Sequence, residues 1–343
     1  MNRSEMTVRE ATSLSSQLVS RIESRLGVRH ARQRLGIEAE HESQVFGGGM
    51  SFFHPENWYS AHALIRGTLR ISGMLGRARR NAHRLRVVHN HIVLKSLPAQ
   101  CDGLRILHLS DLHIDMSEHI VERIVEAVAG LEYDLCVLTG DYRFRTYGNT
   151  SEVVAGMSRL REHLHSPTFA VLGNHDSVRM LPDLEDMGIH LLMNEHFLFH
   201  HNGGSVYIAG IDDAHFFGAH NIAEALSDVP WDSCSVLLSH TPEVYRQAAH
   251  AGADLLLCGH THGGQICLPG GYPLTLDARI PRSYGHGAWQ HATMLGYTSP
   301  GAGSSIVDAR FNCPPEVTVH RLSRGDRVPP NRYRRAIRRK QEQ

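Results

Sequence analysis

Two histidines separated by a single residue occur in the segment GHTHGGQ (259–265). His260 and His262 follow the apolar run LLLC, and side chains two positions apart at the end of a strand point to the same side. Imidazole is the commonest metal ligand among protein side chains, so this pair predicts a metal site rather than a packing role. An ion held there needs further ligands from other parts of the chain.

Four other polar clusters follow apolar runs in the same way. They are DLH (111–113), GD (140–141), GNHD (173–176) and SH (239–240). Ligands of open α/β sheets bind at the carboxyl ends of the strands, so these clusters are expected to converge on one site. Together with the histidine pair they supply seven candidate ligands, namely Asp111, His113, Asp141, Asn174, His240, His260 and His262.

The chemistry of these ligands restricts the choice of metal. Oxygen and nitrogen ligands without a thiolate suit Mn²⁺, Fe or Zn²⁺ better than Mg²⁺ or Ca²⁺. Seven ligands exceed the needs of one ion, and two ions that share a bridging aspartate fit the number. The sequence therefore predicts two divalent metal ions, with Mn²⁺ preferred and with Fe and Zn²⁺ as alternatives.

The elements that must position these clusters alternate between strands and helices. Strands are expected within 86–94, 104–115, 133–143, 168–176, 205–213, 234–243 and 253–264, and helices at 119–131 and 151–164. Apolar strands of this kind, alternating with helices, predict an α/β domain with buried sheets.

The ordered motifs DxH, GD, GNHD, H and GHxH, over roughly residues 90–322, resemble those of the calcineurin-like metallophosphoesterase superfamily. The segments LPAQCDGLRILHLSDLHID, GHTHGGQICLPGG and GAGSSIVDARFNCPPEVTVHRL are similar to the YkuE/YaeI-like bacterial phosphodiesterase branch. The resemblance implies a four-layer sandwich of two mixed β-sheets flanked by helices. In this chain an N-terminal helical extension precedes that domain.

The resemblance also implies individual roles. It assigns one ion to Asp111, His113 and His262, and the other to Asn174, His240 and His260, with Asp141 bridging both. His175 would stabilise the transition state or protonate the leaving oxygen, and Asp176 would orient His175. Arg143 and Arg145 are candidates for clamping a substrate phosphate, and a role in a surface loop is equally open. For Asp212 and Asp213, a turn-forming role is favoured over support of the metal ligands.

Two adjacent cations lower the pKa of a shared water, and the resulting hydroxide can attack phosphorus in line with the leaving group. We therefore expect a phosphodiesterase or pyrophosphatase for a lipid-linked or nucleotide substrate. The segment GDYRFRT lacks the GDxxDRG pattern of protein phosphatases. His175 stands where the common cytosolic lipid A pathway hydrolases have arginine. UDP-2,3-diacylglucosamine hydrolase, nuclease and non-catalytic scaffold are the alternatives, and nucleic acid is disfavoured because few aromatics accompany the basic tail.

The net charge of zero hides a strong segregation of charge. Residues 1–100 carry 15 Arg and Lys against 7 Asp and Glu, and residues 101–323 carry 12 against 26. An acidic centre suits a site that needs cations, and basic ends either suit an anionic surface or are simply solvated. Three parts are expected: a basic helical extension (1–85), a metallophosphoesterase domain (86–323) and a basic, disordered tail (324–343).

Residues 58–80 carry Trp58, Ala61, Ile65 and Leu69 near helical spacing, together with five arginines. The segment suits an amphipathic helix on an anionic membrane, and packing against the catalytic domain is the alternative. No signal peptide, no membrane-spanning apolar stretch and no CxxC pair among six cysteines is found in the sequence. The expected location is the cytoplasm, with peripheral contact at the inner membrane face as an alternative.

Overall fold

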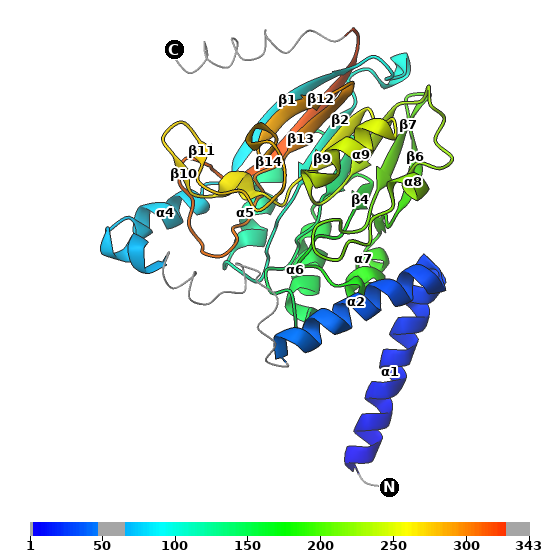
Figure 1. The fold of residues 1–343 in the computed structure, drawn as a ribbon, viewed down its shortest axis with the longest axis vertical. Coiled ribbons are helices and arrows are strands. Elements are labelled where there is room, and N and C mark those ends of the chain that lie inside the picture. The colour runs from blue at the N-terminus through cyan, green and yellow to red at the C-terminus, as the bar shows by residue number, and fades with distance from the viewer. Residues whose placement is uncertain (1–2, 47–65, 327–343) are drawn as a thin grey trace.

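The computed structural model describes residues 3–46 and 66–326 of the chain. Two six-stranded β-sheets pack face to face, and helices cover their outer faces (Figure 1). The expected sandwich of two mixed sheets flanked by helices is confirmed. Within the described ranges, no helix is both long enough and apolar enough to cross a membrane.

The first sheet carries the strands that precede three of the predicted motifs. Its order is β1 (Arg86–Leu94), β14 (Glu316–Arg324), β2 (Arg105–Leu109), β3 (Leu135–Leu138), β4 (Thr168–Ala170) and β5 (Ile189–Leu191). Strands β2 to β5 are parallel, whereas β14 runs antiparallel to β2 and parallel to β1. A strand from the end of the chain therefore lies between the first two strands in sequence.

The second sheet carries the two histidine motifs. Its order is β12 (Gly287–His291), β13 (Met294–Thr298), β9 (Leu255–Cys258), β8 (Ser235–Leu238), β7 (Gly204–Gly210) and β6 (Glu195–His201). The four central strands are parallel, and an antiparallel strand closes each edge. A short hairpin of β10 (Cys267–Leu268) and β11 (Tyr272–Pro273) follows the last histidine motif.

Strand β3 shows why the predicted strands read as continuous apolar runs. Its four residues are all buried, because each face of the strand meets a different layer. Cys136 and Leu138 pack under helices on the outer face, while Leu135 and Val137 face the second sheet. Burial on both faces removes the alternation of polar and apolar residues that a half-exposed strand would show.

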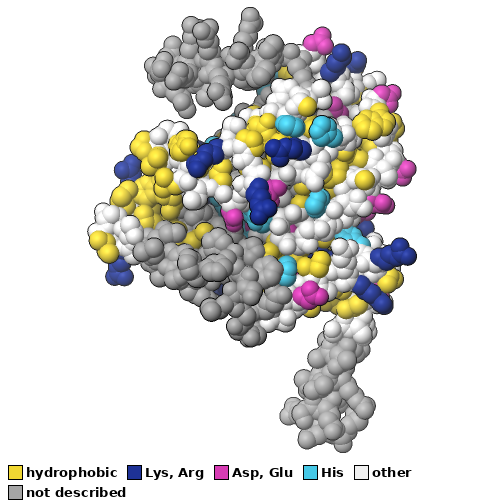
Figure 2. All heavy atoms as spheres, in the orientation of Figure 1, with side chains coloured by type: hydrophobic (Ala, Val, Ile, Leu, Met, Phe, Trp, Pro, Cys, Tyr) yellow, Lys and Arg dark blue, Asp and Glu magenta, His cyan; other side chains and the backbone are white. Residues whose placement is uncertain are grey.

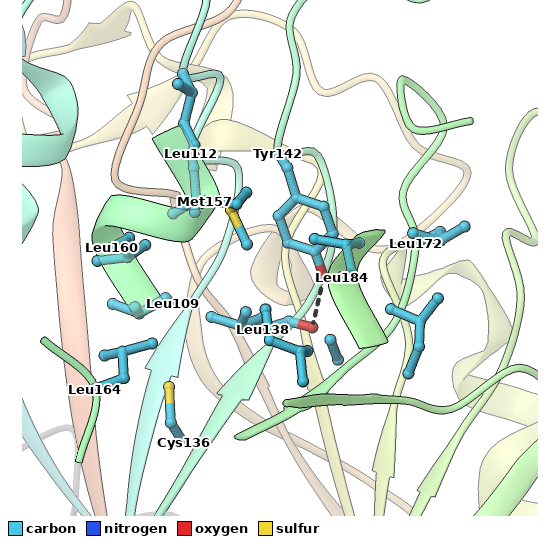
Figure 3. Packing of buried hydrophobic residues seen from close by; sticks show 14 of the residues in the cluster. Leu109, Leu112, Cys136, Leu138, Tyr142, Met157, Leu160, Leu164, Leu172 and Leu184 are labelled. Atoms are coloured by element: carbon cyan, nitrogen blue, oxygen red, sulfur yellow. Dashed lines mark hydrogen bonds between the residues drawn. The ribbon is translucent and has the colours of Figure 1, made fainter. Parts of the chain in front are cut away.

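Helices complete the outer layers. The first sheet is covered by α5 (Ile120–Val128), α6 (Ser151–Arg161) and α7 (Leu181–Asp186), and the second by α8 (Ile222–Ala225) and α9 (Tyr245–His250). Figure 3 shows Met157 and Leu160 of α6 and Leu184 of α7 lying over Leu109 and Leu138 of the sheet.

The N-terminal extension contains α1 (Arg3–Leu26), α2 (Val28–Phe46) and α4 (Leu75–Ala82). Residues 58–65 of the predicted amphipathic segment, and residues 327–343 of the basic tail, lie outside the described residues. Leu69 and Ala78 are buried against Val307, Ala309 and Phe311, so the described part of the segment packs on the catalytic domain.

Candidate metal centre

The seven predicted ligands follow the carboxyl ends of five strands and are all buried. Three groups have ligand atoms within 4.8 Å of one another, and two of them consist of predicted ligands: Asp111, His113 and His262 form one, and Asp141, His240 and His260 the other. The third joins His260 to His215 and Asp277. Asn174 joins the second group, because its Oδ1 lies 2.9 Å from His240 Nε2.

Asp141 lies between the two groups. Its Oδ2 is 3.3 Å from His240 Nε2 in its own group and 3.8 Å from His113 Nε2 in the other. The Nε2 atoms of His113 and His262 lie 3.1 Å apart, so both imidazoles face the same place. The structure therefore brings all seven predicted residues together, with Asp141 in the position expected for a bridging ligand.

Five of these ligands adopt a backbone conformation that residues other than glycine rarely use. The positive φ angles belong to Asp111, His113, Asp141, His260 and His262, and range from 43° to 70°. Such residues cost of order 1–3 kcal/mol each and cluster at functional sites, where the surrounding structure enforces them. The sharp turns after β2, β3 and β9 are therefore maintained by the rest of the fold.

Glycines in the motifs make room for the ligands. A Cβ atom at Gly173 would overlap the Asp141 carboxylate, and one at Gly259 would overlap the side chains of Ser110 and Asp111. The motifs GNHD and GHTH thus contain glycine where a ligand from another strand passes directly over the backbone.

Hydrogen bonds to carbonyl groups fix the tautomers of three ligand histidines. Nδ1 of His113 donates to Arg143 O (2.9 Å), and Nδ1 of His240 donates to Thr139 O (2.8 Å). His260 instead donates from Nε2 to Asp277 O (2.6 Å). A carbonyl can only accept, so the ring nitrogen that would coordinate an ion is Nε2 in His113 and His240 and Nδ1 in His260. Ligand histidines in metal sites are oriented in this way, which means that the residues present fit divalent ions.

Burial and mutual attraction set the charges of the metal-free site. Burial opposes ionisation of Asp141, but His240 and His175 outweigh it and hold the pKa of its carboxyl well below the ordinary value. Burial lowers the pKa of His240, but Asp141 and Asp111 more than compensate and raise it to about 10. Burial also lowers the pKa of His113 to about 4 and raises that of Asp111 to about 6. Without metal, His240 and Asp141 therefore form a buried ion pair.

Metal binding is expected to release a proton from His240. Its imidazole is protonated at neutral pH in the metal-free protein and must lose that proton to act as a ligand. Affinity for Mn²⁺ should therefore rise with pH up to about 10. The ion pair's own stabilisation of the metal-free fold is complete below about pH 6.5 and disappears as pH rises through about 10.

Calorimetric titration of Mn²⁺ in two buffers of different ionisation enthalpy measures this proton release. A His240→Asn variant serves as the control and should release about one proton fewer per chain than the wild type. Equal proton release by the two chains would contradict the ion pair.

A chain of hydrogen bonds leads from strand β1 to Asp111. Ser110 Oγ donates to Asp111 Oδ2 (2.5 Å), and Thr139 Oγ1 donates to Ser110 Oγ (2.7 Å). The proton of Thr139 is thereby used, so Thr139 accepts from His108 Nε2 (2.8 Å). Burial lowers the pKa of His108 to about 4, which keeps this imidazole neutral.

The direction of the remaining bonds follows from neutral imidazoles. His108 Nδ1 accepts from His320 Nε2 (3.2 Å), and His320 Nδ1 accepts from Asn90 Nδ2 (3.0 Å). Burial also lowers the pKa of His320 well below its ordinary value. Every donor in the chain therefore points toward the Asp111 carboxylate, and the chain orients one carboxylate oxygen while the other faces His262 at 3.4 Å.

Removing the last donor should weaken metal binding. We expect Ser110→Ala to raise the dissociation constant for Mn²⁺ by about 10-fold, as loss of a hydrogen bond to a ligand usually does. Ser235→Ala is the matched control, because Ser235 is also buried but lies at the amino end of β8. Titration calorimetry on both variants provides the measurement, and equal affinities would show that the chain does not support Asp111.

The predicted catalytic pair differs partly from expectation. His175 is buried with Nε2 3.9 Å from Asp141 Oδ2, which places the imidazole beside the metal ligands. Its Nδ1 lies 3.0 Å from Thr146 Oγ1. Asp176 instead accepts backbone N–H groups of Gly173, Asp141, Tyr142 and Arg143, at 2.7–3.3 Å. Asp176 therefore holds the turns of the GD and GNHD motifs together, and its expected orientation of His175 stays a prediction.

The two predicted phosphate-binding arginines also occupy different environments. The Arg143 side chain is buried, and its Nη2 donates to the carbonyls of Tyr147 (2.7 Å) and Gly148 (3.4 Å). It therefore shapes its own loop, and a phosphate contact by Arg143 stays a prediction. Arg145 is exposed, and its backbone N–H donates to Asp115. A substrate contact by Arg145 remains a prediction.

Sequence reasoning missed several supporting residues. The buried guanidinium of Arg310 donates to Pro300 O (2.6 Å) and to Gly303 O, and Nη2 lies 3.2 Å from His262 Nδ1. Asp213 shapes a turn by accepting N–H groups of Phe216 and Phe217, as expected. Asp212 instead binds side chains of α2, and no motif in the sequence indicated that contact.

Residues 104–264 match the profile of the calcineurin-like phosphoesterases. The chain is 32% identical over 236 residues to the uncharacterized metallophosphoesterase YkoQ of Bacillus subtilis, covering 66% of this chain and 86% of YkoQ. The chain therefore belongs to the calcineurin-like phosphoesterase family, whose members are metal-dependent phosphoric ester hydrolases.

Other relatives extend the comparison. The uncharacterized metallophosphoesterase YkuE of Bacillus subtilis is 27% identical over 271 residues, which cover 76% of this chain and 93% of YkuE. A zebrafish (Danio rerio) protein described as a transmembrane protein with a metallophosphoesterase domain is 28% identical over 253 residues, or 68% of this chain. The chain spans 56% of the length of that protein.

Proposed function

We propose that this enzyme hydrolyses a phosphodiester or pyrophosphate bond with the help of two divalent ions, preferably Mn²⁺. The observation that carries the proposal is the pair of buried ligand groups with Asp141 between them. One ion would be held by Asp111, His113 and His262, and the other by Asn174, His240 and His260, with Asp141 shared.

The charges around the centre favour a diester over a monoester. Arg143 follows the shared ligand Asp141 by two residues, Arg310 lies beside His262, and both guanidinium groups donate to backbone carbonyls. Direct contacts that neutralise the substrate would therefore come mainly from the ions and His175, with Arg145 as the further predicted contact. A phosphodiester carries one negative charge, whereas a monoester carries nearly two at neutral pH, so the diester needs less compensation.

The chain's own residues supply proton transfer and orientation. When bound, the two ions polarise the phosphoester and lower the pKa of water, so that hydroxide is available near neutral pH. His175 Nε2 faces the centre and can donate a proton to the leaving oxygen, while Thr146 contacts Nδ1 and sets the ring orientation. Asp176 fixes the positions of the loops that carry Asp141 and His175 relative to each other, through its four backbone hydrogen bonds.

Asp141→Asn tests the proposal. Metal-depleted enzyme resupplied with Mn²⁺ should hydrolyse bis-p-nitrophenyl phosphate faster than p-nitrophenyl phosphate. Changing residues that only support metal ligands costs about 10–100-fold, so loss of the shared ligand should reduce kcat/KM by more than about 100-fold. Asp228→Asn, at an exposed position, is the control and should retain wild-type activity.

Two results would contradict the proposal. A faster rate on the monoester would reject the diester preference, and undiminished activity of the Asp141 variant would reject the shared ligand.

A surface near α4 supports a lipid-linked substrate. Ile71 and Met74 are 91% and 42% exposed, and the neighbouring arginines 66, 70, 77, 79 and 80 are all exposed. The β10–β11 hairpin adds exposed Leu268 and Tyr272, and Figure 2 shows hydrophobic side chains gathered on this side of the molecule. Apolar and cationic side chains together suit the surface of an anionic membrane. UDP-2,3-diacylglucosamine is one substrate that combines a nucleotide, a pyrophosphate and a lipid.

Sedimentation with vesicles tests the membrane contact. The chain should bind vesicles containing phosphatidylglycerol, bind less in high salt, and lose binding in the double variant Ile71→Glu/Met74→Glu. Trp231→Ala is the control, because Trp231 is 82% exposed but lies before β8. Binding that is equal in all three chains would reject this surface as the membrane contact.

A further inference from the structure

Helix α2 inserts a fully buried arginine beside the candidate metal centre. The Arg34 side chain has no exposed surface, and three groups surround its guanidinium. Nε donates to Asp212 Oδ1 (3.2 Å), Nη2 donates to the backbone carbonyl of Asp176 (3.0 Å), and Nη1 pairs with Glu38 Oε1 (2.8 Å). The guanidinium also stacks on Phe217 at 3.3 Å from the ring centroid.

Glu38, one turn further along α2, reaches the next two residues of the same loop. Its Oε2 accepts from Ser177 Oγ and its Oε1 accepts from the backbone N–H of Val178, both at 2.7 Å. Arg34 and Glu38 therefore bind three consecutive residues, 176–178. These residues directly follow Asn174 and His175.

Arg34, Glu38 and Asp212 form a buried network of charged groups, although apolar residues would be sufficient to dock a helix. A buried arginine is stable only when it is paired, and apolar residues of similar size usually pack at least as favourably. Here Arg34 is paired with two buried carboxylates, those of Asp212 and Glu38. Burial opposes ionisation of Asp212, but Arg34 and His30 hold the pKa of its carboxyl below the ordinary value.

Asp176 connects the helix to the shared ligand. Its carbonyl accepts from Arg34, while its carboxylate accepts the backbone N–H of Asp141 (2.7 Å) and of Gly173 (2.9 Å). The backbone N–H of His175 donates in turn to Asp141 Oδ1 (3.0 Å). A displacement of residues 176–178 would thus move both Asn174 and the turn that presents Asp141.

We propose that Arg34 and Glu38 are positioning residues of the metal centre, which makes α2 a part of the active site. They hold the loop 174–178 so that Asn174 faces His240 and His175 faces Asp141. Both residues lie outside the stretch 104–264 that matches the family profile. The proposal rests on the metal ligands assigned above and is independent of the substrate.

Arg25 of α1 offers a matched control. It also anchors the extension to the catalytic domain, through Glu185 (2.7 Å), Glu195 (2.6 Å) and the carbonyl of Leu191 (2.8 Å). None of these partners belongs to the loop 174–178. Arg25→Met and Arg34→Met each remove one cation that binds the extension to the domain, but only the second removes a contact with the metal-binding loop.

The experiment counts bound Mn²⁺ by electron paramagnetic resonance on the full chain, using wild type, Arg34→Met, Arg34→Lys, Glu38→Gln and Arg25→Met. Wild type should bind two ions. Arg34→Met should weaken binding of the ion assigned to Asn174, His240 and His260 by about 10–100-fold, the range for changes in residues that support ligands. The other ion, which shares only Asp141 with it, should be weakened less. Excess Mn²⁺ should then restore much of kcat. Arg25→Met should bind both ions as the wild type does.

The milder variants keep the test decisive if Arg34→Met fails to fold. Lysine offers a point charge and cannot bind three acceptors with the geometry of a guanidinium, so Arg34→Lys should show the same selective loss to a smaller degree. Glutamine keeps one carbonyl oxygen as acceptor. The Glu38→Gln variant should therefore bind the ion assigned to Asn174, His240 and His260 with an affinity between those of the wild type and Arg34→Met. Circular dichroism and thermal melting establish that each variant is folded.

Three results would overturn the proposal. If folded Arg34 and Glu38 variants bind both ions with wild-type affinity, these two residues do not position the metal ligands, and α2 only attaches the extension to the domain. An equal loss in Arg25→Met would show that docking of the extension in general, and not these two residues, affects the ions. A folded wild-type chain that binds no Mn²⁺ would reject the metal centre itself, and with it this proposal and the proposed function.

Discussion

The need to neutralise buried negative charge governs this structure. Asp111, Asp141 and Asp176 lie within one water-excluded region, and an isolated carboxylate there would be strongly unfavourable. Each is compensated differently: Asp141 by imidazoles, Asp176 by backbone N–H groups, and Asp111 by Ser110 and the N–H of His260. Compensation of these carboxylates requires the carboxyl ends of five strands to lie close together. The face-to-face packing of the two sheets places them there.

The fold and the metal ligands could be predicted because their signals are local. A strand buried on both faces leaves a continuous apolar run, and a ligand that follows it leaves a polar residue beside a glycine. Asn174 and His240 lie 66 positions apart, yet each could be recognised from its own few neighbours. The order of the strands in each sheet, including the place of β14, was supplied only by the structure.

The supporting residues could not be predicted, because their partners are distant and consist largely of backbone. Asp176 stands next to His175 in sequence, which suggested a side-chain pair, but its carboxylate accepts backbone N–H groups from the turn that follows β3. The guanidinium of Arg143 is bonded to carbonyls of its own loop. Arg34 binds groups 142 and 178 positions away, and nothing in the composition of α2 distinguishes it from a solvated arginine.

The position of β14 has a consequence for how the molecule is made. Strand β2, which presents Asp111 and His113, pairs on one side with residues 318–321 and on the other with β3. During synthesis on the ribosome, β2 and its ligands are complete some 200 residues before that neighbour emerges. Strand β2 therefore lacks its neighbour on one side until residues 318–321 have been made, and such long-range pairing is slow to form. The turn that presents Asp111 and His113 is therefore flanked on both sides only after the other strands of the two sheets have been made.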